Sequence, residues 1–68
     1  MVAVDDKVRF DAFADMKQGI EKIVHKVTGT VYEVNYEHKV FHVVYPSGGR
    51  MLRTSFKFCD IGTKVRVV

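Results

Sequence analysis

The sequence has one cysteine, one proline and no tryptophan among its 68 residues. A single cysteine excludes an intrachain disulfide, and a chain without a cysteine framework does not fit the small secreted scaffolds that depend on such bridges. We therefore expect Cys59 to be reduced and the protein to be cytoplasmic. Because its neighbours include the apolar Phe58 and Ile61 and no base, we interpret Cys59 as a buried packing residue.

Long apolar runs are also missing. No segment approaches the ~20 consecutive apolar residues that cross a bilayer. The first ten residues, MVAVDDKVRF, carry acidic side chains where a signal peptide would have its apolar core. We expect no membrane partner, which agrees with a cytoplasmic location.

The residue combinations that enzymes and metal sites need are absent as well. No Ser or Cys stands in a pattern with a base and a third, orienting group. His38 and His42 straddle a turn and a strand, and no second cysteine completes a tetrahedral zinc site. The carboxylates at 5–6, Glu33 and Glu37 fit solvated positions on a turn and a hairpin rim. We therefore predict a non-enzymatic protein without a cofactor or metal.

The chain does have enough apolar residues for one small core. Hydrophobic residues make up 47% of the sequence, although a chain this short buries only about 60% of the surface that its unfolded form exposes. We expect a single domain over residues 1–68, with Val, Ile, Leu and Phe packed between strands and little room for a buried active site.

The clearest structural signal is the segment 27–45, VTGTVYEVNYEHKVFHVVY. Two runs rich in β-branched and aromatic residues, 27–36 and 40–45, flank a polar break at 37–39. This pattern predicts an antiparallel hairpin.

Side-chain alternation adds detail to this hairpin. Phe41 and Val43 share one face of the second run, and we expect that face to be the core side. In the first run Val31 keeps one phase and Val34 leaves it. The strand should therefore bend or bulge near residues 32–33.

The N-terminal part combines a clear strand with an ambiguous segment. Residues 7–11 alternate polar and apolar side chains and predict a half-buried strand. In residues 12–26 the apolar positions recur at helical spacing, whereas Gly19 and the β-branched pair at 23–24 favour strand. We expect a long connection with room for one helical turn in its first half and an extended approach from about Ile20. A full helix is the alternative.

The C-terminal part predicts a second hairpin and a last strand. Residues 46–49, PSGG, form the strongest turn signal in the chain. The strand 50–58 should follow, with even-numbered positions inward, then a tight turn at 60–62 held by Ile61. Residues 64–68 should form a short strand with Val65 and Val67 inward.

The sequence therefore predicts a mostly all-β fold, a small five-stranded antiparallel SH3-like barrel. The features that indicate it are five short strands, a long first connection and a one-turn connector before the last strand. The predicted core is listed here: Val8, Phe10, Val31, Phe41, Val43, Leu52, Phe56, Ile61 and Val65.

Several sequence elements also carry a resemblance: DKVRF (6–10), VTGTV (27–31), HKVF (38–41) and SFKFCDIG (55–62). Through these the chain resembles a family of short uncharacterised SH3-like barrel proteins of Gram-positive bacteria and their phages, along nearly its whole length. More loosely, VTGTV before a hairpin is similar to KOW and Tudor-type small barrels. The resemblance to KOW and Tudor-type barrels implies RNA, ribosomes or RNA polymerase as partners. Neither of the two resemblances supplies functional residues.

The remaining candidate site is a surface. Net charge is +3, from 11 Lys and Arg against 8 Asp and Glu, which permits nucleic-acid contact. Outward positions of three strands carry cations and the central hairpin carries aromatic rings, the ingredients of single-strand recognition. In an SH3-like barrel the first and last strands are neighbours, which would bring Arg9 and Arg66 together. The candidate nucleic-acid-binding residues are Arg9, Tyr32, Tyr36, Arg53, Lys57 and Arg66.

Two other interpretations stay open. Charged outward positions are expected on any small barrel because they keep it soluble. Barrels of this size also bind peptides between aromatic loops, or extend the sheet of a protein partner through an open edge strand. The sequence therefore predicts a binding module for nucleic acid or a nucleoprotein complex, with a protein-interaction module as the alternative.

Overall fold

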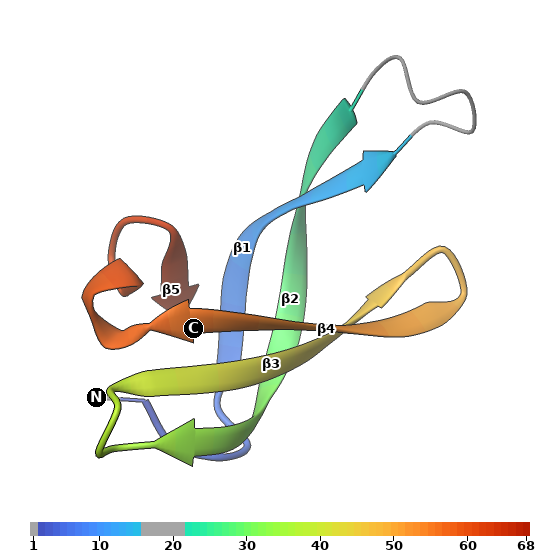
Figure 1. Cartoon of the computed structure of the whole chain (residues 1–68). Coiled ribbons are helices and arrows are strands. Elements are labelled where there is room, and N and C mark those ends of the chain that lie inside the picture. Colours follow the sequence, from blue (N-terminus) through green and yellow to red (C-terminus); the bar gives the residue numbers. More distant parts are fainter. Residues whose placement is uncertain (1, 16–21) are drawn as a thin grey trace.

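The computed structural model describes residues 2–15 and 22–68, with side chains described for residues 2–12 and 25–68. These ranges form five strands and one short 3-10 helix (Figure 1). In chain order the elements are β1 (Lys7–Asp15), β2 (Lys22–Asn35), β3 (Val40–Ser47), β4 (Arg50–Lys57), η1 (Phe58–Asp60) and β5 (Val65–Val67). Nothing in the described ranges is a helix of the length and apolar character that crossing a membrane requires.

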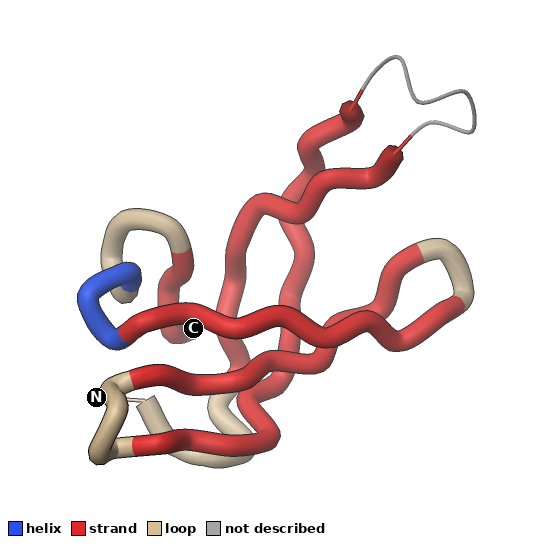
Figure 2. Tube along the Cα trace, in the orientation of Figure 1, coloured by secondary structure: helices blue, strands red, loops and turns tan. Residues whose placement is uncertain are grey.

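All five strands belong to one antiparallel sheet with the order β4-β3-β2-β1-β5 (Figure 2). The strands from β1 to β4 pair in chain order, and β5 returns from the other end of the chain to pair with β1. The inner face of the curled sheet encloses one hydrophobic core. The fold is thus a small all-β, SH3-like barrel, as the sequence predicted.

β2 is the strand that bends the sheet. Its first part pairs with β1 as far as Thr30, and its last part pairs with β3 from Thr30 to Asn35. The register with β3 shifts between Val31 and Glu33, where the sequence predicted a bend or bulge. Because a bulge increases local twist, one long strand can serve both halves of the barrel.

The ambiguous segment 12–26 is strand at both of its described ends. Ala12 pairs with His25, and the ladder continues to Asp15 opposite Lys22. The alternative of a full helix is therefore wrong, as is a helical turn at 12–15, while the extended approach is confirmed from Lys22 onward. Strand pairing overrides the helical spacing because each arm supplies hydrogen-bond partners for the other's backbone. The rest of the predicted turn, 16–20, lies outside the described residues.

The second hairpin closes through two glycines. Gly48 and Gly49 have φ angles of 56° and 78°, which suits a two-residue type I′ turn between the paired Ser47 and Arg50. The predicted hairpin is confirmed, but Pro46 belongs to β3 and not to the turn. The pair after the turn-closing one in such a hairpin exchanges no backbone hydrogen bonds, so the missing N–H of Pro46 costs nothing there.

Most of the predicted core is confirmed. Six of the residues are buried, and Phe56 and Ile61 pack against them while partly buried. The prediction that Leu52 lies in the core is wrong, because 39% of this residue is exposed. It has the inward phase, but it lies near the tip of the β3–β4 hairpin, which extends beyond the body of the barrel (Figure 1). Among the side chains that the structure describes, the buried hydrophobic residues are Val2, Val8, Phe10, Ala12, Val27, Val31, Phe41, Val43 and Val65.

The two chain ends differ from the sequence prediction. Val67 is 41% exposed although it was expected to face inward, because β5 is an edge strand of only three residues. Val2, which no periodicity indicated, is buried. The Tyr36 hydroxyl donates a hydrogen bond of 3.2 Å to the Val2 carbonyl, and the Asp5 N–H donates one of 2.8 Å to Val31. These bonds hold the N-terminal segment against the end of the central hairpin.

Cys59 is exposed, so its interpretation as a buried packing residue is wrong. It lies in η1, where three residues make one turn and side chains three apart fall on the same side. Phe58 and Ile61 therefore both pack on the core and Cys59 points away from it.

Candidate functional site

Arg9 and Arg66 lie directly opposite each other on β1 and β5, as the sequence predicted. Both are exposed. Like charges in directly opposed positions destabilise a sheet, and among the described side chains neither arginine has a carboxylate within ion-pair distance. The pair therefore weakens the fold unless an anion is bound.

The two arginines line a recess of about 330 Å³ that we call the basic notch. β5 pairs with β1 only as far as Phe10, whereas β1 continues to Asp15. Beyond Phe10 the β5 side of β1 is therefore unpaired, and this difference in strand length leaves the recess. Its lining consists of Arg9, Phe10, Asp11, Lys26, Thr63, Lys64 and Arg66.

The basic notch holds the excess charge of the whole molecule. Its four cations and one carboxylate give it +3, which equals the net charge of the chain, so the seven other cations and seven other carboxylates cancel. Lys26 is bonded to Asp11 at 3.1 Å, in a pair that is largely exposed. Lys64 lies 3.9 Å from Asp60. The Lys26–Asp11 pair is exposed and therefore weak, and the side chain of Lys64 is 74% exposed, so both lysines stay available to an external anion.

A second cluster lies on the outer face of the central hairpin and β4. The guanidinium of Arg53 lies over the ring of Tyr32, 5.5 Å from its centroid, a cation–π geometry. The imidazole of His42 lies 6.0 Å from the same ring, and its Nδ1 is 2.6 Å from the Ser55 hydroxyl. We call these four residues the outer stack. Tyr32 is 40% exposed, so part of the cluster is accessible to solvent.

A row of paired residues connects the two regions along the outer face. Lys7, which shares the outward phase of Arg9, pairs with Thr30, Thr30 pairs with Val44, and Val44 pairs with Arg53. Neighbouring strands are about 4.8 Å apart, so the row spans roughly 14 Å of sheet. The basic notch and the outer stack thus belong to one connected surface.

Of the other two candidate residues, Lys57 follows Ser55 on the same face of β4, and Tyr36 lies in the turn after β2. Lys57 ends β4, exposed and paired with Val40, while its backbone N–H donates a 3.0 Å hydrogen bond to the Asp60 carboxylate. The ring of Tyr36 lies edge-on to Phe58, with centroids 5.9 Å apart, and its hydroxyl is bonded to Val2. Tyr36 therefore holds the N-terminal segment while 56% of it stays exposed, and its part in the candidate site stays a prediction.

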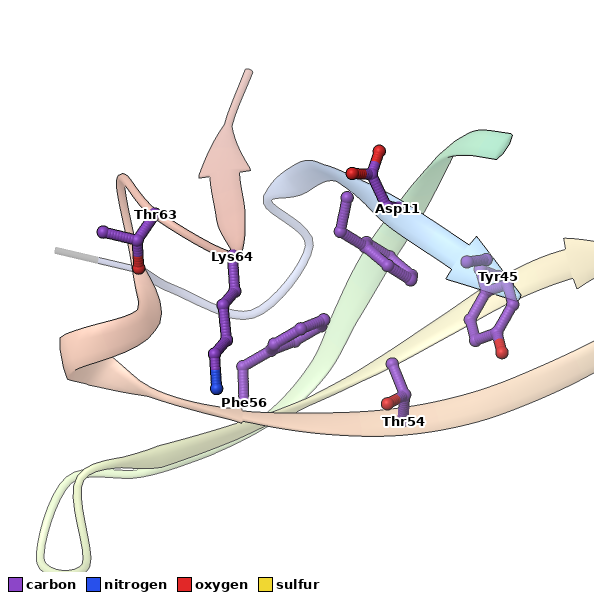
Figure 3. Close-up of a pocket in the computed structure, with 8 residues that line it drawn as sticks. Asp11, Tyr45, Thr54, Phe56, Thr63 and Lys64 are labelled. Carbon is purple, nitrogen blue, oxygen red and sulfur yellow. The ribbon is translucent and has the colours of Figure 1, made fainter. Parts of the chain in front are cut away.

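The inner face opens beside the basic notch into a larger recess, the aromatic pocket (Figure 3). This pocket has a volume of about 710 Å³. The ring of Phe10 lies 5.1 Å from those of both Tyr45 and Phe56, in edge-to-face arrangements. The lining is Phe10, Asp11, Ala12, Tyr45, Thr54, Phe56, Thr63 and Lys64.

Sequence reasoning missed Lys26, Thr63 and the aromatic pocket. Lys26 was part of the ambiguous segment, and its outward phase follows only from the pairing of Asp11 with Lys26. The alternation of the other strands carried enough information to place Phe10, Tyr45 and Phe56 on one face. The alternation did not give the length of β5. That length decides how much of β1 is left unpaired and therefore where the recess lies.

Within the described part of the chain, no three His, Cys, Asp or Glu side chains are grouped closely enough to hold a metal ion. Comparison of the chain with protein-family models, curated proteins and solved structures gave no match. The resemblance to short SH3-like barrel proteins therefore stays a prediction.

Proposed function

We propose that the protein is a non-enzymatic module that binds single-stranded nucleic acid, free or within a nucleoprotein complex. The observation that carries the proposal is the placement of the whole excess charge in the basic notch, around Arg9 and Arg66. Phosphate groups are the anions that such a cluster would bind, because each neutralised phosphate also releases condensed counterions. The location that we propose is the cytoplasm, which the single cysteine favours.

The opposed arginines support this function energetically. The repulsion between them is relieved when a phosphate lies between the two guanidinium groups, since each can then donate charge-assisted hydrogen bonds to it. The cost that the pair imposes on the free protein is thus recovered on binding.

The outer stack supports a single strand over a duplex. Tyr32, which is 40% exposed beneath the guanidinium of Arg53, offers aromatic surface to an unpaired base, and stacking of this kind contributes about 1–3 kcal/mol per base without sequence preference. The bases of a duplex are stacked on one another and cannot reach it.

The proposal is tested by titrating a single-stranded oligonucleotide at several salt concentrations. Wild type should bind saturably, and the Arg9→Ala, Arg66→Ala double variant should lower the slope of log affinity against log salt by about 1.4, or about 0.7 for each lost contact. Arg50→Ala, at the far tip of the β3–β4 hairpin, is the matched control and should keep the slope.

Two results would contradict the proposal. If wild type shows no saturable binding at low salt, nucleic acid is excluded as the ligand. If the double variant keeps the salt slope of wild type, the basic notch is excluded as the phosphate-binding site. In either case the alternative is a protein partner added at the free edge of β4, the edge strand opposite β5. Such binding would depend little on salt.

A further inference from the structure

The basic notch and the aromatic pocket are neighbouring parts of one recess. They share four lining residues, Phe10, Asp11, Thr63 and Lys64. Lys64 reaches in from the segment before β5 on the side of Phe56 (Figure 3). A cationic site that can bind an anion therefore adjoins an aromatic pocket, and Lys64 is the cation that lines both.

The aromatic pocket has the chemistry of a base-binding slot. Its lining includes the rings of Phe10, Tyr45 and Phe56, which pack edge-to-face, and two hydroxyl-bearing residues, Thr54 and Thr63. Unpaired bases are held in proteins by stacking between aromatic or apolar side chains together with hydrogen bonds to their edges. The volume of about 710 Å³ lies in the ordinary range of small-molecule pockets.

We propose that the aromatic pocket takes one nucleobase while the phosphate of the same nucleotide lies in the basic notch, on Lys64 and Arg66. The inference rests on the proposed function and adds to it. The strand follows the outer face of the barrel, and one nucleotide, at an end or splayed from the strand, turns inward at the start of β5.

The charge around the aromatic pocket favours a nucleotide over a peptide as its ligand. The slot opens next to a cluster of +3, and the carboxylate inside it, Asp11, is already paired with Lys26. A ligand that carries a flat aromatic group and an anionic group on one small framework fits this arrangement, and a nucleotide, with its base and phosphate joined through the sugar, is such a ligand. A peptide would need an acidic residue beside an aromatic one.

The test uses the full chain and three probes: adenosine monophosphate, adenosine and inorganic phosphate. Binding is followed by amide chemical shifts. Adenosine monophosphate should bind at least tenfold more tightly than either part, and it should shift the amides of Ala12, Thr54 and Thr63, which flank the pocket.

Two variants locate the binding. Lys64→Ala, whose side chain is 74% exposed, should fold normally and weaken adenosine monophosphate at least fivefold. Thr54→Tyr fills the slot and should weaken adenosine monophosphate while leaving inorganic phosphate unchanged, a result that also shows the variant is folded. Arg50→Ala is the control and should bind as wild type does.

The outcomes separate this inference from the proposed function. If adenosine monophosphate binds no better than phosphate while the oligonucleotide still binds with its salt slope, the base pocket is excluded and strand binding stands. If adenosine monophosphate binds in the pocket and the oligonucleotide does not bind, the nucleotide site stands and strand binding is excluded. If a peptide with adjacent Glu and Phe displaces adenosine monophosphate and binds more tightly, the pocket is a peptide site and the inference is overturned.

Discussion

Gly29 of β2 packs directly against Val43 of β3, with no room for a side chain between them. A Cβ on Gly29 would overlap with Cγ1 of Val43 and would lie 3.0 Å from the carbonyl oxygen of Val44 and 3.2 Å from the ring of Phe10. The glycine of the VTGTV segment is therefore needed for close packing at the point where β2 passes from one partner strand to the other.

Gly29→Ala should accordingly lower the free energy of unfolding by about 1–3 kcal/mol, the usual cost of overpacking a core. Urea unfolding measures the change. Thr28→Ala, one residue away and on the exposed side, is the control and should stay within about 0.5 kcal/mol of wild type. A Gly29→Ala protein as stable as wild type would show that β2 and β3 can move apart at little cost.

The Gly48 position should accept asparagine and reject valine. Its φ of 56° lies in the left-handed region, and no atom lies within 4 Å of a Cβ built there, so only the backbone conformation limits the substitution. Asn-Gly is a preferred type I′ pair, whereas a β-branched residue should cost about 1–2 kcal/mol or more. Thermal unfolding of Gly48→Asn and Gly48→Val compares the two directly. Equal losses in both would mean that the turn is not type I′.

Removing one arginine of the opposed pair should stabilise the free protein. Arg66→Thr ends the repulsion with Arg9 and should raise the free energy of unfolding by about 0.2–1 kcal/mol at low salt. In 1 M salt, where the screening length is about 3 Å, the gain should disappear. Arg50→Thr, opposite the neutral Ser47, is the control and should show no salt-dependent gain. A gain that persists at high salt would have a cause other than charge.

Tyr36→Phe separates an anchoring residue from a binding residue. Loss of the hydrogen bond to Val2 should lower the free energy of unfolding by about 0.5–1.5 kcal/mol. Affinity for a single-stranded oligonucleotide should not change. Because the phenyl ring of Phe still stacks, Tyr36→Ala is added, and weaker binding by Tyr36→Ala at a temperature where it is fully folded would show that this residue binds the strand, as the sequence predicted.

Cys59 should react with a bulky thiol reagent in the native protein, without denaturant, because its side chain is exposed in η1. Cys59→Ser should change the free energy of unfolding by less than about 0.5 kcal/mol. Labelling that requires unfolding would restore the packing role that the sequence indicated.

The strands could be predicted from sequence because alternation is a local property. Phe41 and Val43 on one face, the bulge after Val31 and the turn at Gly48 each follow from a few adjacent residues. Val2 could not be predicted, because its burial depends on Tyr36 and the turn that follows β2. Leu52 and Val67 stand at positions whose alternation points inward, as predicted. Alternation does not show how far the rest of the barrel extends to cover such positions, and both residues are exposed.

The candidate site was predicted only in part for a similar reason. The meeting of Arg9 and Arg66 follows from strand order, which the fold class supplies. The participation of Lys26 and Lys64 depends on β5 being much shorter than β1, and no periodicity expresses that difference. Tyr36 looked available because a turn residue with an aromatic ring has no evident place in a core.

The pairing of β5 with β1 also has a consequence for folding. Each of the first four strands pairs with a neighbour in the sequence, whereas Val8 must find Val67 at the opposite end of the chain. Contacts that close a long loop carry a larger entropic cost and form late. The four strands from β1 to β4 can therefore pair first, and Arg9 meets Arg66 only when β5 joins β1.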